Sequence, residues 1–226
     1  SSMLANEFRD EMGWSNILWQ PMGTSPTKYL EQWDVFEGKV VAAQCVTVSQ
    51  ADIDILKKYN VAIAHCPKSN AKLGTGVAPL VDFLNRGLRV GLGTGSLASN
   101  NTMDLFDEMR TALLIQRGLN KSVEGLNADK FVRMATLGGA EVLGVDSRIG
   151  SLEAGKQADI IAVNISHSHQ KPVSDPYSTI VYTANQEDVA FTMVNGKILY
   201  YKGEWKTLDK EEIVSQSEIA RSKLRN

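Results

Sequence analysis

The chain has 226 residues, of which 43% are hydrophobic, 22% charged and 7% aromatic. This composition is typical of a globular protein and excludes a disordered or collagen-like chain, and the length suffices for one domain with an appendage. Twenty-four lysines and arginines against 26 aspartates and glutamates give a formal net charge of −2, so the chain lacks the basic field that nucleic-acid binding requires.

Three short runs of small apolar residues predict strands covered on both faces: 40–46 (VVAAQCV), 61–66 (VAIAHC) and 89–95 (RVGLGTG). The segments between them predict helices. Residues 49–59 begin with a capping serine and have apolar residues at helical spacing, and residues 76–87 end at a glycine. Strands alternating with helices at this spacing predict right-handed crossovers in a parallel sheet.

Two further helices are predicted after the third strand. Residues 103–117 have an apolar stripe, with acidic residues first and arginines last, which suits the helix dipole. Residues 128–143 predict a second helix, with Leu143 on its inward face and with Gly138 and Gly139 weakening its middle.

From Gly150 onward the pattern becomes that of β-structure. The predicted strands are 158–163, 179–183 and 189–201. The last is expected to fold back at Asn195-Gly196, since Asn-Gly between apolar flanks is the strongest short signal for a hairpin. A polar tail helix follows, with Asp209 as its N-cap.

Two long motifs carry a family resemblance. HCPKSNAKLGTGVAPL (65–80) and RVGLGTGSLASNNTMDLFDEMRTALLIQ (89–116) resemble the amidohydrolase superfamily, in particular the branch of methylthioadenosine/S-adenosylhomocysteine deaminases and triazine hydrolases. The segments ATLGGAEVLG (135–144) and IGSLEAGKQADIIAVN (149–164) continue the match in register.

The resemblance implies an α/β fold that is the C-terminal half of a (β/α)8 metallo-dependent hydrolase barrel plus a small β-sandwich domain. Residues 1–149 would form the partial barrel, with strands five to eight and their helices. Residues 150–206 would form part of the β-sandwich, and residues 207–226 a C-terminal helix. Barrel strands one to four have no counterpart in this sequence.

The positions that carry the chemistry in that family are substituted. The resemblance places Met3 where the family has a metal-binding His, and Asn6 where it has a proton-shuttling Glu. Gln44 replaces a His that binds metal or substrate, Thr47 replaces a second His, and Gly95 replaces an Asp that binds metal and activates water. The family metal is zinc or iron, and we expect no cofactor in this chain.

Hydrolytic deamination needs a Lewis acid that lowers the pKa of water toward ~7, a base that takes its proton and an acid that returns one. Glycine offers no ligand atom, glutamine is a weak neutral ligand, and the Asn6 amide exchanges no proton near neutral pH. We therefore expect no catalytic residue to be intact.

The remaining candidates for a substrate pocket are His65, Ser69, Asn70 and Ser96. The alternative for His65 is a buried histidine that supports the site from behind. The alternative for Ser69 and Asn70 is that they bind loop backbone through their side chains.

Two motifs imitate functional sites. His167-Ser168-His169 resembles the metal-binding His-x-His of the superfamily, but it follows a β-domain strand, so a solvated loop is the better interpretation. Residues 91–96 (GLGTGS) could cradle a phosphate, yet they fit neither GxGxxG nor a P-loop, so a loop at the barrel end is preferred.

The leading functional hypothesis is an amidohydrolase-type protein that resembles hydrolases of ring amidines and is catalytically silent as this chain. The alternative is a non-catalytic interaction or ligand-binding subunit on the same scaffold. The expected partners are a second copy of the chain or a missing N-terminal half, with a small molecule as a further ligand. No stretch approaches the ~18 apolar residues of a membrane span, and Cys45 and Cys66 lie in runs typical of reduced thiols. We therefore expect a cytoplasmic protein without a membrane partner.

Overall fold

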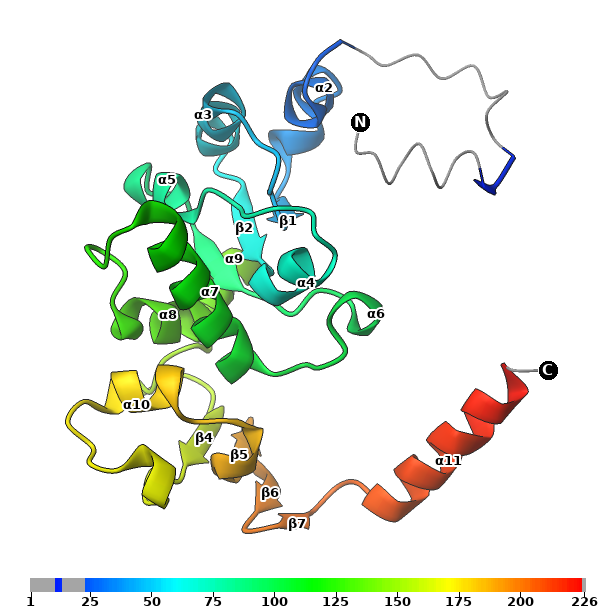
Figure 1. The fold of residues 1–226 in the computed structure, drawn as a ribbon, viewed down its shortest axis with the longest axis vertical. Helices are drawn as coiled ribbons and strands as arrows, with labels where there is room; N and C mark the ends of the chain where they lie inside the picture. The colour runs from blue at the N-terminus through cyan, green and yellow to red at the C-terminus, as the bar shows by residue number, and fades with distance from the viewer. Residues whose placement is uncertain (1–10, 14–22, 225–226) are drawn as a thin grey trace.

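The three strands predicted in the first half of the chain pair into one parallel sheet. The computed structural model describes residues 11–13 and 23–224, and it places β1 (Val41–Ala43), β2 (Ala62–His65) and β3 (Val90–Leu92) in the order β1-β2-β3 (Figure 1). The strands are shorter than the runs that predicted them. β1 ends early because Gln44 and Cys45 have φ angles of 69° and 47°, which no strand continues.

Helices precede, connect and follow these strands. In chain order they are α2 (Pro26–Gln32), η2 (Val35–Glu37), α3 (Gln50–Lys58), α4 (Pro67–Lys72), α5 (Leu80–Asn85), α6 (Leu97–Asn100), α7 (Leu105–Asn120), α8 (Ala128–Ala135) and α9 (Leu137–Leu143). The helix predicted over 76–87 is confirmed only as α5. It begins after Pro79, since a residue that precedes proline is disfavoured in the helical region.

Successive side chains point to opposite faces of the parallel sheet, and a different helix packs on each face. Ile63 and Val90 are partners in register and join Leu113 of α7 in the main apolar core. Gly91 faces α9, and a Cβ on Gly91 would lie only 2.8 Å from the Cα of Gly139. The absence of a side chain at Gly91 therefore lets α9 approach the sheet.

The helix predicted over 128–143 is two helices. α8 and α9 are separated at Thr136, whose φ and ψ are −121° and −97°. Gly138 lies where a Cβ would come within 2.9 Å of the Val90 carbonyl oxygen, so the glycine pair permits the close contact with β3. The expectation that Leu143 faces inward is wrong, since it is 68% exposed.

The second half forms a four-stranded antiparallel sheet. Its strands are β4 (Ile160–Val163), β5 (Val189–Val194), β6 (Lys197–Tyr201) and β7 (Glu204–Trp205), in the order β4-β5-β6-β7. The hairpin predicted at Asn195-Gly196 is confirmed, and both residues have the positive φ angles, 49° and 77°, that a tight hairpin turn needs. The 3-10 turns η3 (Ser168–Gln170) and η4 (Gln186–Asp188) lie between β4 and β5.

The strand predicted at 179–183 is wrong, because this segment belongs to helix α10 (Pro176–Tyr182). Asp175 caps the helix by accepting hydrogen bonds from the backbone N–H groups of Tyr177 at 3.2 Å and Ser178 at 2.9 Å. Pro176 is at the first turn, where its fixed φ favours a helix. The capping outweighs the β-propensity of the branched residues.

The tail helix predicted with Asp209 as its N-cap is confirmed as α11 (Lys210–Lys223), and the Asp209 carboxylate accepts from the Glu212 N–H at 2.9 Å. α11 stands apart from the body of the molecule (Figure 1). In the described residues no helix combines the length and the apolarity that crossing a membrane requires.

Substitution Gly91→Ala should lower the free energy of unfolding by ~1–3 kcal/mol, because its Cβ would overlap the α9 backbone. Gly118→Ala in α7 is the matched control, since nothing lies within 4 Å of a Cβ there. Alanine is the better helix former, so the control should be neutral or stabilising by ~0.5–1 kcal/mol. Urea unfolding measures both, and equal midpoints for the two variants would contradict the packing of α9 on β3.

Candidate functional site

The parallel arrangement brings the carboxyl ends of the three strands to one edge of the sheet. The Gln44 N–H donates to the Ala64 carbonyl at 2.8 Å, and the Gly93 N–H donates to the His65 carbonyl at 2.9 Å. The residues after β1 and β3 are therefore anchored on β2. This edge, with Gln44 and the loop around Gly95, is the candidate functional site, since active sites of such barrels lie where the strands end.

At Gly95 two serine side chains lie close to the backbone. Gly95 has φ 68°, and a Cβ on it would lie 3.3 Å from the Cβ and Oγ of Ser69 and 3.5 Å from Ser99 Oγ. The Ser69 hydroxyl donates to the Ser99 hydroxyl at 2.8 Å, and Ser99 donates to the Ser96 carbonyl at 3.0 Å. A larger side chain at this position would have a strained backbone and would press on Ser69.

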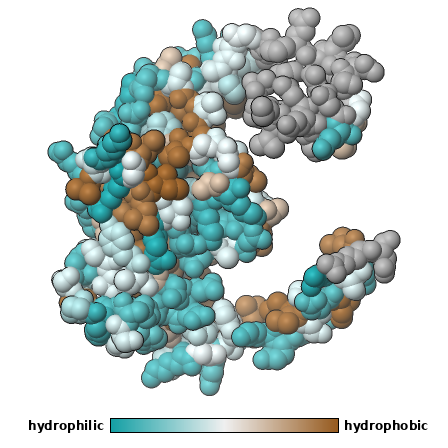
Figure 2. All heavy atoms as spheres, in the orientation of Figure 1, coloured by the Kyte–Doolittle hydropathy of each residue, from teal (hydrophilic) through white to brown (hydrophobic). Residues whose placement is uncertain are grey.

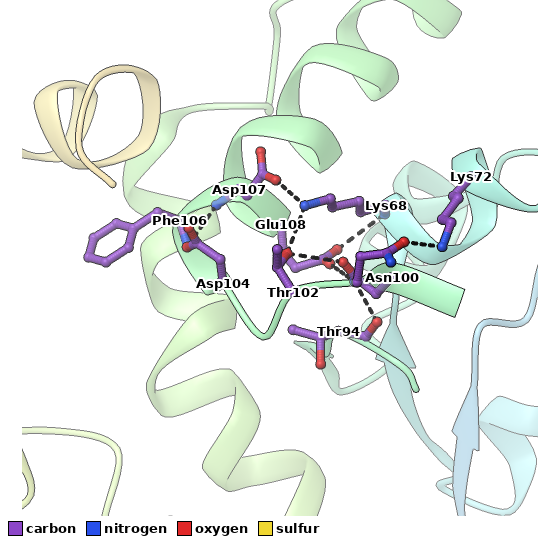
Figure 3. A network of polar contacts seen from close by, with 10 residues as sticks. Lys68, Lys72, Thr94, Asn100, Thr102, Asp104, Phe106, Asp107 and Glu108 are labelled. Carbon is purple, nitrogen blue, oxygen red and sulfur yellow. Dashed lines mark hydrogen bonds and ion pairs between the residues drawn. The ribbon is translucent and has the colours of Figure 1, made fainter. Parts of the chain in front are cut away.

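A buried carboxylate holds the loop after β3 from behind (Figure 3). Glu108 of α7 is fully buried, and it accepts from Asn100 Nδ2 at 2.5 Å and from the Lys68 N–H at 3.2 Å. The same Asn100 amide donates to the Thr94 carbonyl at 2.6 Å. Burial raises the pKa of Glu108, and the hydrogen bond from Asn100 works against that rise. Together these contacts join α4, α6 and α7 to the strand end.

The lysines near the site are engaged in the same scaffold. Lys68 Nζ donates to Thr102 Oγ1 at 2.8 Å and forms an ion pair with Asp107. Lys72 Nζ contacts the Ala98 carbonyl and the Asn101 side chain. The sequence analysis did not predict the roles of Glu108 and Lys68.

His65 and Asn70 lie behind the strand ends, on the side of α7. They are 1% and 2% exposed, and they line a cavity of about 20 Å³ together with Ala112 and Gln116 of α7. His65 Nδ1 and both amide atoms of Asn70 have no hydrogen-bond partner among the described residues. Burial lowers the pKa of His65 to about 4. The four pocket candidates therefore separate, with Ser69 and Ser96 at the loop by Gly95 and His65 and Asn70 in the wall behind it.

The residues present do not fit a catalytic metal. Gly95 supplies no ligand atom and Gln44 only a neutral amide, and no group of three or more His, Cys, Asp and Glu side chains in residues 11–13 and 23–224 could hold a metal ion. Met3 and Asn6 lie outside the described residues.

The His-x-His imitation at residues 167–169 lies in and beside η3. Both imidazoles face the buried Asp188 carboxylate, with His167 Nδ1 at 3.5 Å and His169 Nε2 at 3.9 Å from its oxygens. The two side chains are half exposed, in agreement with a solvated loop. This pair belongs to the second half of the chain and not to the strand ends of the parallel sheet.

The comparisons with known proteins decide the family. Residues 20–199 match the model of the amidohydrolase family. The chain belongs to this family. It is 42% identical over 194 residues to a 5-methylthioadenosine/S-adenosylhomocysteine deaminase of Moorella thermoacetica, a match covering 86% of this chain and 45% of that protein. A deaminase of the same name from Thermodesulfovibrio yellowstonii is 36% identical over 204 residues, which is 90% of this chain and 46% of the relative.

Solved structures agree. An adenosine deaminase from Xanthomonas campestris with bound zinc superimposes with a TM-score of 0.88 at 30% identity, covering 98% of this chain and 49% of that one. Atrazine chlorohydrolase from Arthrobacter aurescens in complex with zinc gives 0.83 at 28% identity, covering 97% and 47%. The chain thus spans about half the length of the relatives it matches. The predicted family and the fold, half of an amidohydrolase barrel with a β-sheet region, are confirmed.

The buried His65 predicts an acid-sensitive fold. Its folded pKa, about 4, lies below its ordinary value of 6.5, so between these pH values the unfolded chain binds more protons. The free energy of unfolding should therefore fall as the pH drops from 6.5 to 4, by up to about 3 kcal/mol from this group. His65→Gln should remove that part of the slope, as measured by urea unfolding at pH 7, 5.5 and 4. Equal slopes in both proteins would contradict the burial of a neutral imidazole.

Proposed function

We propose that this chain is a catalytically silent half of an amidohydrolase-type deaminase scaffold. The observation that carries the proposal is the strand-end edge. By the family resemblance, Gln44 stands there in place of a His that binds metal or substrate, and Gly95 in place of a metal-binding Asp. Ser69 lies in the space beside Gly95. The deaminase relatives support the class of the scaffold, which is hydrolysis of a C–N bond at a ring amidine.

The side chains at several positions together support the absence of catalytic activity. Attack of water on a ring amidine needs a Lewis acid and a group that moves protons. The family positions Met3 and Asn6 offer a thioether and an amide, neither of which transfers a proton near neutral pH. The imidazole of His65, the last residue of β2, is 1% exposed and lines the small cavity against α7, so it is shielded from solvent.

Zinc should not bind at the strand-end edge. In His167→Ala/His169→Ala, which removes the two half-exposed imidazoles, calorimetric titration should detect no zinc site with a Kd below about 1 μM. Neither this variant nor the unaltered chain should release ammonia from 5-methylthioadenosine or S-adenosylhomocysteine with zinc present. Stoichiometric zinc in the double variant together with chelator-sensitive turnover would refute the proposal.

We assign the other half of an amidohydrolase barrel as the partner of this chain. The relatives are about twice as long as the matched region. Val41 and Leu105 are 45% and 37% exposed. A groove of about 330 Å³ between the two halves of the chain is lined by apolar residues such as Met109, Ile161 and Ile180. Such uncovered edges and faces favour association.

The free cysteines Cys45 and Cys66 support action in a reducing compartment such as the cytoplasm.

Co-expression tests this assignment. The part of the Moorella thermoacetica deaminase outside its matched 45%, here called the complementary fragment, should co-purify with this chain as a 1:1 complex measured by light scattering. That complex should be inactive, since Gln44 and Gly95 remain. A stable monomer that does not bind the complementary fragment would contradict a barrel-half partner. A symmetric homodimer would show that the partner is a second copy of this chain.

A further inference from the structure

Figure 2 shows hydrophobic residues gathered on the visible face of the half that contains the parallel sheet. The opposite mismatch between a side chain and its surroundings lies inside that half. His65 at the end of β2 and Asn70 in α4 are 1% and 2% exposed. His65 Nδ1, Asn70 Nδ2 and Asn70 Oδ1 form no hydrogen bond with any described residue. A buried polar atom without a partner destabilises the folded state, so these three atoms call for a ligand.

The backbone of both residues is hydrogen-bonded, in contrast to these side-chain atoms. The Asn70 N–H donates to the Cys66 carbonyl at 3.1 Å, and the Asn70 carbonyl accepts from the Thr75 N–H at 3.1 Å. The His65 carbonyl accepts from the Gly93 N–H at 2.9 Å. The local backbone therefore holds both side chains at this place.

Both side chains line a cavity of about 20 Å³, whose wall also includes residues of α7 and of the loop that precedes α5. A cavity needs about 10–15 Å³ to hold one water molecule, whereas pockets for small organic ligands measure roughly 300–1,000 Å³. The volume therefore admits one water molecule and excludes larger ligands.

The polar atoms beside this cavity match the chemistry of water. Burial lowers the pKa of His65 to about 4, so its imidazole is neutral at pH 7, and Nδ1 either donates or accepts according to the tautomer. The Asn70 amide offers both a donor and an acceptor. Water can donate to and accept from such groups, whereas an ion would find no opposite charge there.

The other side-chain amide of the wall already has partners. Gln116 Nε2 donates to the Ala78 carbonyl at 2.8 Å, and Gln116 Oε1 accepts from Asn120 Nδ2 at 3.3 Å. The side chain of Ala112 contributes only a methyl group. A water molecule in the cavity therefore has His65 and Asn70 as its partners, and two to four polar partners are usual for an internal water.

We propose that this cavity is a binding site for one internal water molecule, which forms hydrogen bonds with His65 Nδ1 and with the Asn70 side-chain amide. The water joins the end of β2 to α4, and it stabilises the wall behind the strand-end edge. The inference depends neither on the proposed partner nor on the absence of catalytic activity.

Two measurements on the full chain test the site. A crystal structure of the unaltered chain should show one density peak within hydrogen-bond distance of both His65 and Asn70. Oxygen-17 magnetic relaxation dispersion counts water molecules that stay bound for longer than the protein takes to tumble, and it should include this one.

A variant that fills the cavity provides the comparison. Ala112 is fully buried in α7 and lines the cavity, so Ala112→Val adds two methyl groups there. The variant should have one long-lived water fewer, and its urea midpoint should fall because His65 and Asn70 lose their partner. Gly118→Ala is the matched control in the same helix, since nothing lies within 4 Å of a Cβ there. It should keep the water count of the unaltered chain.

Absence of density between His65 and Asn70, together with equal dispersion amplitudes for the unaltered chain and Ala112→Val, would overturn the proposal. Density in the cavity that contacts neither side chain would overturn it as well. If Ala112→Val does not fold, the crystal structure of the unaltered chain decides alone. Density in contact with both side chains then supports the site, and a cavity without density refutes it.

Discussion

Three parallel strands have two free edges and cannot close on themselves, and this constraint governs the molecule. β2 is paired on both sides, but β1 and β3 each present an unpaired backbone edge within the described residues. α7 covers one face of the sheet, while the other face meets α9 through Gly91. Since parallel sheets are stable when both faces and edges are covered, an arrangement of this kind favours a covering polypeptide.

The same strand ends show that the proposed absence of metal chemistry is compatible with a stable scaffold. In a metal-dependent site, carboxylate and imidazole ligands crowd one point, and their mutual repulsion is offset by the cation. At this edge the residues are the neutral Gln44, Gly95 and the hydrogen-bonded pair Ser69 and Ser99. No cation is needed to hold such a set together, so the fold can retain the strand ends while lacking the groups that bind metal.

The sequence predicted the parts of the fold that depend on apolar runs and on turns with strict backbone demands. The three parallel strands and the Asn195-Gly196 turn belong to this group. Prediction failed where long-range contacts decide. The left-handed residues after β1, the break at Thr136 and the capped helix α10 depend on neighbours distant in sequence or on caps that compete with β-propensity. Glu108 stands among the buried residues of α7, and a glutamate at such a position could have predicted a buried, hydrogen-bonded carboxylate.

The contacts of Glu108 and Asn100 stabilise the loop after β3 whether or not the site is catalytic. Asn100 contacts both the Glu108 carboxylate and the Thr94 carbonyl, so these side-chain contacts hold the loop after β3. If Asn100 were replaced, the buried Glu108 carboxylate would lose a hydrogen-bond donor, and the free energy of the folded state would rise. Replacement of either residue is therefore disfavoured. The positions that the family resemblance assigns to catalysis, Gln44 and Gly95, face no such restriction, because they lie at the edge where the strands end. The proposed loss of activity and the retention of the loop are therefore physically compatible, since different side chains are responsible for each.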